Sequence, residues 1–332
     1  MRFSAKSSAL WRQVIVKTGL TLGVVSAVGL SAAIARAEDR PSWLSYASSV
    51  SPAAPFGQPR AAAAAAKHDA DDVDTEHIFG FSMGSDIGKA GEVELEVENI
   101  GRFGKRFGSY FGGGTLAQMK FVLTDRFRVA PGVSFGTNQI SDIPGMANNH
   151  RSAFAGASME FRYKVLDRNE MPFGLTVHAA PGWSRVDDAT GIDQLSYGSE
   201  FAALIDKELI KDRLFGTVNF WFSAGSARDL ANSWTHASDF AVHTALSYKV
   251  NSDLIIGGEA RYVRAYHGAS LDNLAGNALF IGPTFSVHLA KNVGLSGTFS
   301  TQVAGKAIND HNRYDLEHFE RHEALLRLNY LF

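Results

Sequence analysis

Strict alternation of polar and apolar residues runs through most of the chain and limits what it can fold into. In residues 92–100, EVELEVENI, Val93, Leu95 and Val97 share one face and the glutamates share the other. A period of two residues is typical of a β-strand with two chemically different faces. After residue 37 no run approaches 18 consecutive apolar residues, so we expect no membrane-spanning helix there. The pattern predicts an all-β protein.

Similar alternating segments recur to the end of the chain, separated by polar breaks. The predicted strands are 92–100, 113–125, 127–138, 151–166, 172–186, 195–210, 213–226, 237–250, 254–267, 277–290, 293–306 and 319–332. Their connections alternate between short turns, such as 124–126 and 290–292, and longer loops, such as 139–150 and 307–318. Short turns at one end and long loops at the other are typical of an up-and-down transmembrane β-barrel. We predict an antiparallel barrel of twelve strands.

The even number of strands is consistent with a bacterial barrel, but it does not assign a position to one segment. Twelve strands place both termini on the periplasmic side, as in bacterial barrels. Residues 77–88, HIFGFSMGSDIG, then lie in the lumen or at the periplasmic rim. The alternative is a barrel of fourteen strands that includes this segment.

The N-terminus has the three parts of a secretory signal peptide. An apolar run, 18–33, precedes an A-x-A cleavage site formed by Ala35 and Ala37. The run is shorter than the about 20 residues that a spanning helix needs, which disfavours a membrane anchor. The basic residues of the leader are Arg2, Lys6, Arg12 and Lys17 at its start and Arg36 at the cleavage site. We expect export and cleavage after residue 37.

Residues 38–76 have the composition of a linker. The segment is rich in Pro, Ala and Ser, contains six consecutive alanines, and ends in an acidic run. We predict a disordered linker, with a plug in the barrel lumen as the alternative, and a barrel domain over 77–332.

Loss of the leader removes five positive charges and takes the net charge from −2 to −7. An acidic chain without cysteine disfavours nucleic acid as a partner and excludes thiolate metal sites.

The chain ends on a strand, EALLRLNYLF, with no room for a turn. Alternation directs Phe332, Tyr330 and Leu328 toward lipid, and Arg327 and Asn329 toward the lumen. We expect this strand to pair with 92–100 and close the sheet. It resembles the signal read by the outer-membrane barrel-assembly machinery, which implies that this machinery is a partner of the chain.

A narrower resemblance rests on two stretches. GFSMGSDIGKAGEVELEVENIGRFGKRFGSY and TDRFRVAPGVSFG are similar to a group of proteobacterial outer-membrane barrels that are grouped with porins and transporters. The resemblance implies a bacterial outer-membrane location and a barrel fold. It implies no ligand and no functional residues.

Charged residues recur on the predicted lumen face. They are Glu92, Glu94, Glu96, Glu98, Lys120, Glu160, Arg162, Lys164, Glu200, Glu259, Arg261, Glu323 and Arg327. In one interpretation they form cross-strand ion pairs that brace a filled barrel. In the other they line a water-filled pore, and the run of glutamates favours cations. The sequence alone leaves both open.

The sequence offers only weak candidates for a catalytic or a metal-binding site. His243 with Ser247, and His288 with Ser286, fall on lumen faces, whereas a lipid hydrolase needs its Ser-His pair at the lipid surface. The motif G-x-S-x-G is absent. A metal site is not predicted, although one loop is rich in candidate ligands: Asp310, His311, Asp315, Glu317, His318, Glu320 and His322. We predict no enzyme activity and no cofactor.

These observations favour a porin-like channel or transporter for small solutes, embedded in outer-membrane lipid. The alternative is a structural or accessory barrel with a filled, ion-paired lumen. A less favoured third function is an outer-membrane lipid hydrolase.

Overall fold

The computed structural model describes residues 73–332, except 229–231 and 309. The predicted signal peptide, with Ala35 and Ala37, and most of the predicted linker lie outside the described residues. Within the described part of the chain, no helix is long and apolar enough to cross a membrane.

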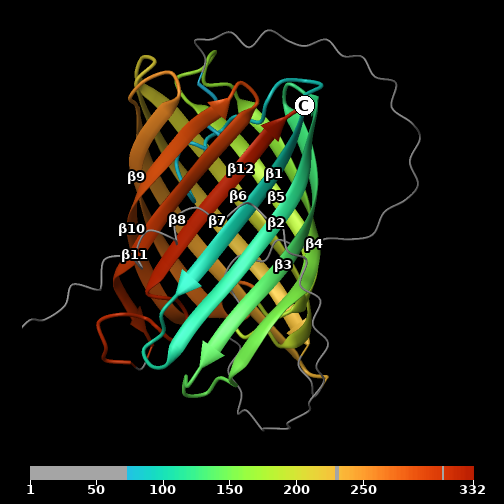
Figure 1. The fold of residues 1–332 in the computed structure, drawn as a ribbon, viewed down its shortest axis with the longest axis vertical. Coiled ribbons are helices and arrows are strands. Elements are labelled where there is room, and N and C mark those ends of the chain that lie inside the picture. Colours follow the sequence, from blue (N-terminus) through green and yellow to red (C-terminus); the bar gives the residue numbers. More distant parts are fainter. Residues whose placement is uncertain (1–72, 229–231, 309) are drawn as a thin grey trace, which may run out of the picture. The chain divides into compact units, whose positions relative to one another are not determined.

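The described residues form twelve antiparallel strands in one closed barrel, in which each strand pairs with its neighbours in sequence (Figure 1). The strands are β1 (Val93–Phe103), β2 (Ser109–Thr124), β3 (Phe127–Ser141), β4 (Asn149–Leu166), β5 (Gly174–Val186), β6 (Asp193–Ile210), β7 (Leu214–Arg228), β8 (Trp234–Lys249), β9 (Leu254–His267), β10 (Asn273–Ala290), β11 (Val293–Ala307) and β12 (His322–Leu331). The predicted fold class and strand number are confirmed, and the fourteen-stranded alternative is wrong.

Closure occurs where the sequence predicted it, between the first and last strands. In β1 and β12, Glu94 pairs with Leu331 and Phe103 pairs with His322. The backbone N–H of Phe332 donates to the carbonyl of Val93 at 3.0 Å. This pairing removes the sheet edge, which a barrel in lipid cannot leave open.

Strands extend further than predicted at the ends that carry the longer loops. β1 continues to Phe103, and β2 begins at Ser109, so the predicted loop 101–112 shrinks to 104–108. Gly112, which the prediction placed in that loop, therefore lies inside β2, opposite Arg102. Local sequence marks glycines as breaks, whereas ladder hydrogen bonding in a closed sheet keeps them in the strand.

The two faces of the wall have opposite chemistry. Arg128, Arg162 and Arg261 are buried inside, each 1% exposed. The outward face carries exposed apolar side chains: Phe201, Val218, Phe220, Leu246, Ile256, Ile281, Phe285, Phe299, Leu326 and Leu328. Charges inside and an apolar belt outside invert the pattern of a water-soluble protein and are typical of a membrane-spanning barrel.

The two ends of the barrel differ in their connections. At the end where the chain terminates, which we call the turn end, the connections include 125–126, 211–213 and 291–292. The opposite end, the loop end, carries 104–108, 142–148, 187–192, 229–233, 268–272 and 308–321.

Residues 73–92, which we call the lumen segment, pass inside the ring of strands without regular secondary structure (Figure 1). Ile78, Phe79 and Ile87 are at most 4% exposed. Thr75 and Glu76, at the end of the predicted linker, are also buried in the lumen. Residues of the predicted linker thus take part in filling the lumen.

Candidate functional site: a lumen occupied by residues 73–92

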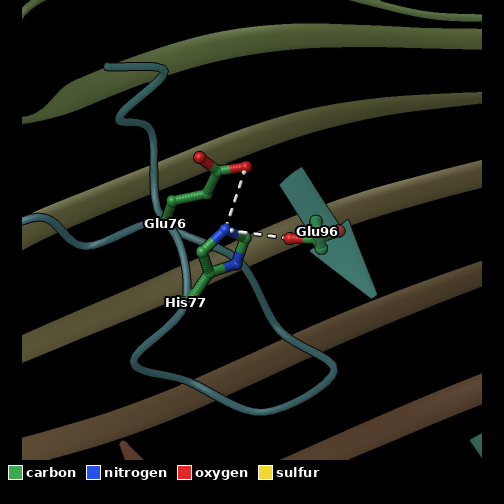
Figure 2. A group of neighbouring side chains, drawn as sticks. All are labelled: Glu76, His77 and Glu96. Atoms are coloured by element: carbon green, nitrogen blue, oxygen red, sulfur yellow. Dashed lines mark ion pairs between the residues drawn. The ribbon is translucent and has the colours of Figure 1, made fainter. Parts of the chain in front are cut away.

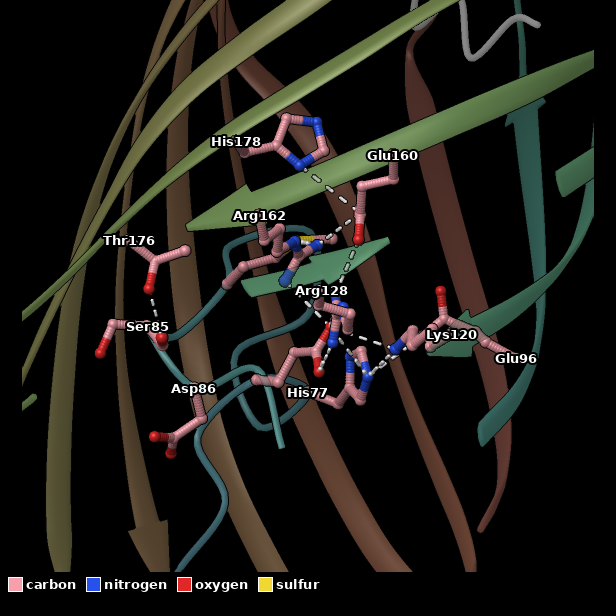
Figure 3. A network of polar contacts seen from close by, with 12 residues as sticks. His77, Ser85, Asp86, Glu96, Lys120, Arg128, Glu160, Arg162, Thr176 and His178 are labelled. Carbon is pink, nitrogen blue, oxygen red and sulfur yellow. Dashed lines mark hydrogen bonds and ion pairs between the residues drawn. The ribbon is translucent and has the colours of Figure 1, made fainter. Parts of the chain in front are cut away.

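Glu76 is the main anchor of the lumen segment. Arg128 on β3 donates to both of its carboxylate oxygens, Nη1 to Oε2 at 2.6 Å and Nη2 to Oε1 at 2.7 Å. Arg162 on β4 donates at 2.9 Å, and the ammonium of Lys120 on β2 lies at 3.0 Å. Figure 3 shows the side chains of Arg128, Arg162 and Lys120 converging from neighbouring strands. Because all four are buried, the attraction is little screened by water.

Beside Glu76, His77 faces Glu96 on β1 across 3.0 Å (Figure 2). Among the described residues, Glu76, His77 and Glu96 are a group whose ligand atoms could converge on one metal ion. Lys120 Nζ, however, lies 2.7 Å from His77 Nε2, 2.7 Å from Glu96 and 3.0 Å from Glu76. The ammonium of Lys120 thus occupies the position that a metal ion would take. We assign these side chains to an ion-pair network.

A second anchor lies near the turn end, around Asp206 on β6. Ser85 donates to Asp206 at 2.5 Å, and Thr75 also donates to this carboxylate. Arg168, in the turn 167–173, approaches Asp86 at 2.6 Å and Asp206 at 3.3 Å. This anchor ties both limbs of the lumen segment to the same point of the wall.

Side chains on the opposite side of the wall bind the backbone in the middle of the lumen segment. Glu259 on β9 accepts from the N–H groups of Phe81 and Ser82 at 3.0 and 3.1 Å. Asn219 on β7 accepts from the N–H of Met83 at 2.7 Å and donates to its carbonyl at 2.8 Å. Inward polar residues therefore replace the ladder partners that this irregular backbone lacks.

Other backbone and ring contacts complete the attachment. Ser247 on β8 donates to the carbonyl of Ile78 at 2.7 Å. The guanidinium of Arg261 stacks on the ring of Phe81 at 3.8 Å. Ile78 and Phe79 pack with Phe215, Ala245 and Ile255 in a small apolar cluster inside the lumen.

A chamber with a mixed polar and apolar lining lies on the loop-end side of the lumen segment. Phe81 and Met83 contribute to its lining, together with Glu160, Glu200 and Trp221 from the wall. Its volume, as space open to the centre of a water molecule, is about 130 Å³, enough for a group of waters or a small solute.

His178 on β5 projects into the chamber between two carboxylates. Its Nε2 lies 3.3 Å from Glu200 and its Nδ1 lies 3.4 Å from Glu160. Figure 3 shows the contact with Glu160. Its ring also meets Trp221 edge-on, with centroids 5.3 Å apart.

Two loops fold inward at the loop end, and one of them, 187–192, contributes Asp187 and Asp188 to the chamber lining. Two side chains of the wall hold loop 187–192. Tyr110 on β2 donates to the carbonyl of Ala189 at 3.0 Å, and Asn138 on β3 donates to that of Asp188 at 2.8 Å. In loop 308–321, Phe319 is buried at 3% exposure, and Glu320 pairs with Lys105 at 2.9 Å. Burial raises the pKa of Asp188 to about 6; nearby Arg102 opposes this shift and Asp187 adds to it.

A second hollow lies toward the turn end. It is lined by Asp74, His77 and Ile78 of the lumen segment and by wall residues that include His288 and Lys291. The lumen segment therefore contributes to two hollows, one toward each end of the barrel.

Most of the predicted lumen charges meet partners in this network. Glu94 and Glu96 contact Lys120, Glu98 contacts Arg327, and Glu323 contacts Arg261. Glu160 contacts Arg162 and Arg128, Glu259 contacts Arg261, and Lys164 contacts Asp167. Glu200 contacts His178, and Glu92 lies outside β1, where it accepts from the N–H of Lys89. The residues that resemble the assembly signal, Phe332, Tyr330 and Leu328, are exposed on the outward face.

The sequence did not single out several residues that attach the lumen segment to the wall. They are Glu76 and His77 in the segment itself, and Arg128, Arg168 and Asn219 outside it. Arg128 and Asn219 occupy inward positions of alternating segments, so their direction was readable from the period of two. Glu76 and His77 carry no such signal, because the segment around them is irregular.

In the lumen, Ser247 and His243 each have partners other than one another. Ser247 donates to the lumen segment, and the ring of His243 lies tilted against that of Trp221, with centroids 5.8 Å apart. On the outward surface, Ser226 Oγ lies 2.6 Å from Nδ1 of His236. Among the described residues no carboxylate or amide orients that imidazole, so the third member of a hydrolase site is missing there.

Two of the loop histidines, His318 and His322, contact different partners. His318 Nδ1 lies 3.0 Å from Asp315, whereas the ring of His322 contacts Thr301 on the wall at 2.9 Å. These two rings thus have separate partners and do not converge on a shared position.

Several solved structures are similar in outline. The NanC porin aligns with TM-score 0.40 and 11% identity over 71% of this chain and 97% of its own. The translocator domain of the autotransporter NalP from Neisseria meningitidis aligns with TM-score 0.39 and 12% identity over 74% and 89%. The KdgM porin, in complex with disordered oligogalacturonate, aligns with TM-score 0.37 and 10% identity over 72% and 99%. Similarities this low carry no inference about what this chain binds.

No curated protein matches the sequence. A family model does, and it covers residues 71–332, which include the lumen segment and all twelve described strands. The chain belongs to the family of unknown function DUF6662.

Proposed function

We propose that the chain is an outer-membrane transport barrel for small solutes, closed in this conformation by its own lumen segment. The observation that carries the proposal is the position of residues 73–92, which contribute to a hollow on either side. The turn end faces the periplasm and the loop end faces the exterior, following the arrangement of bacterial barrels. Solute would enter the chamber from outside.

The attachment of the lumen segment is suited to reversible opening. Its contacts with Asn219, Glu259 and Ser247 are hydrogen bonds that water can replace, and its apolar cluster is small. The ion pairs around Glu76 set the cost of release. A channel closed in this way needs a signal or a gradient to open, which would limit leakage through the outer membrane.

The chamber favours cationic or neutral solutes over anionic ones. Glu200 faces it with the imidazole of His178 as its ion-pair partner, and Asp187 and Asp188 lie at its loop-end side. Arg102 and Arg327 also line it, but Arg327 is paired with Glu98. An excess of carboxylates lowers the energy of a cation in the chamber.

Planar-bilayer conductance of the refolded barrel tests the proposal. The variant Glu76→Gln/Asp206→Asn weakens both anchors, and we expect it to show more frequent or larger openings than the native chain. The native chain has no cysteine, so a disulfide between Ser85→Cys and Gly174→Cys can lock the segment. A Cβ at Gly174 would lie 2.9 Å from that of Ser85, so the bond needs a shift of about 1 Å.

Openings should disappear in the oxidised double-cysteine protein and return on reduction, with Ser85→Cys alone as control. Heat-modifiable gel migration verifies that each barrel is folded. If folded Glu76→Gln/Asp206→Asn passes no current, the transport proposal fails. The alternative, a structural barrel with a filled lumen, is supported by the same buried ion pairs and would then be preferred.

A further inference from the structure

Two basic side chains lie in one row on the outward surface near the loop end. In the sheet register, Arg264 on β9 is opposite Asn277 on β10, and Asn277 is opposite Lys306 on β11. Arg264 and Lys306 are both exposed. Two strand spacings separate them, on the order of 10 Å.

Tyrosines hold the arginine of this row in place. Arg264 Nε donates to the hydroxyl of Tyr262 at 3.1 Å, and Nη1 approaches that of Tyr266 at 3.5 Å. The guanidinium also lies 5.7 Å from the centre of the Tyr262 ring. Tyrosine at this level is typical of the boundary between hydrocarbon and headgroups.

The row has no internal counter-charge. Among the described residues, neither Arg264 nor Lys306 forms an ion pair, and the nearby outward positions Phe240, Leu279 and Ile281 are apolar. A cation beside hydrocarbon is unfavourable unless an anion or water solvates it. Both cations face away from the lumen, so the solute path does not supply that anion.

We propose that Arg264, Asn277 and Lys306 bind the phosphates of a glycolipid of the outer leaflet, of the lipid A class. Charge complementarity and position point to this occupant. The row borders the apolar belt at the end assigned to the exterior, where lipid phosphates meet the barrel wall. A guanidinium binds phosphate with two parallel N–H groups, and the ammonium and the Asn277 amide add further donors.

Native mass spectrometry of the refolded barrel, with diphosphoryl lipid A as probe, tests the site. The variant Arg264→Gln/Lys306→Gln removes both charges while keeping polar side chains. Its matched control, Arg213→Gln/Lys207→Gln, removes two exposed charges at the turn end, where Arg213 likewise approaches Tyr248 at 3.5 Å.

We expect the loop-end variant to bind diphosphoryl lipid A at least tenfold more weakly, and the turn-end control to bind like the native chain. Lipid A without phosphates should bind the native chain as weakly as diphosphoryl lipid A binds the loop-end variant. Equal binding by the two double variants would overturn the proposal. Full displacement of the lipid by millimolar inorganic phosphate would overturn the lipid assignment and indicate a site for free phosphate.

Discussion

Glu76 and Arg128 form a two-point ion pair inside the lumen, with both carboxylate oxygens bonded to the guanidinium at 2.6 and 2.7 Å. The two residues are 52 positions apart, and Glu76 belongs to an irregular segment whereas Arg128 belongs to the wall. Parallel N–H···O⁻ bonds fix orientation as well as distance. This pair therefore sets where the lumen segment lies in the barrel.

Replacing this carboxylate should loosen the segment. In Glu76→Gln, the buried cations Lys120, Arg128 and Arg162 lose a shared counter-charge, at a cost of about 3–5 kcal/mol for a broken buried pair. We expect hydrogen–deuterium exchange protection at the amides of Phe81 and Met83 to fall strongly while the strands stay protected.

The control for this change is Asp193→Asn. Asp193 pairs with Arg151 at 2.6 Å but is 59% exposed, so its loss should cost about 0–1 kcal/mol. Unchanged protection of the lumen segment in Glu76→Gln would show that Glu76 does not anchor it.

A methyl group should be tolerated at one strand glycine and not at another. A Cβ at Gly282 would lie 2.2 Å from the carbonyl oxygen of Phe299 on the next strand, whereas at Gly114 nothing lies within 4 Å. Gly282→Ala should lower the free energy of unfolding in urea by about 1–3 kcal/mol, and Gly114→Ala should leave it unchanged. Equal stability of the two variants would contradict the close approach of β10 and β11.

The seating of loop 187–192 should depend on pH. Burial raises the pKa of Asp188 from 3.8 to about 6, so the seated loop holds a proton that an open loop releases between those values. Its stability is therefore highest below that window and falls as pH rises through about 6. Hydrogen-exchange protection of these amides, corrected for the intrinsic rate, should be greater at about pH 5 than at about pH 7.

Asp188→Asn supplies the control for the pH effect. It keeps the shape of the side chain and removes its titration, so most of the pH dependence should disappear. Persistence of the full dependence would assign it to neighbouring Asp187, whose pKa burial also raises.

Deletion of Phe332 should reduce insertion into the outer membrane without affecting export. Its side chain is 71% exposed on the barrel surface, and its N–H bonds to Val93. Leu289→Ala, which trims another exposed apolar side chain, at 59% exposure, is the control. Normal amounts of folded barrel in membrane fractions of the deletion strain would rule out an assembly role for Phe332.

The wall was predictable because its signal is local. In β12, Leu326, Leu328 and Tyr330 are exposed and Leu325, Arg327 and Asn329 are buried, as the period of two requires. The same alternation defined twelve strands and their closure. Strand ends were less predictable, since residues 101–112 read as a loop, whereas Gly112 is held in β2 by pairing with both neighbours.

The lumen segment shows the limit of local reasoning. Residues 77–88 have no period, and the sequence allowed a lumen, a rim or a strand position for them. The position depends on partners far along the chain, such as Asp206 for Ser85 and Glu259 for Ser82, which only folding brings close. Nor could the sequence separate an ion-paired lumen from an open pore, because the same inward charges serve both.

The sequence by itself determined an up-and-down barrel wall, its two faces and the pairing of its last strand with residues 92–100, because alternation fixes the direction of every side chain in a strand. Tertiary structure alone decided what fills the lumen. Glu76 meets Arg128, Arg162 and Lys120 only after three different strands are placed around it. Long-range ion pairs leave no periodic trace in a sequence, and here they hold residues 73–92 inside the barrel.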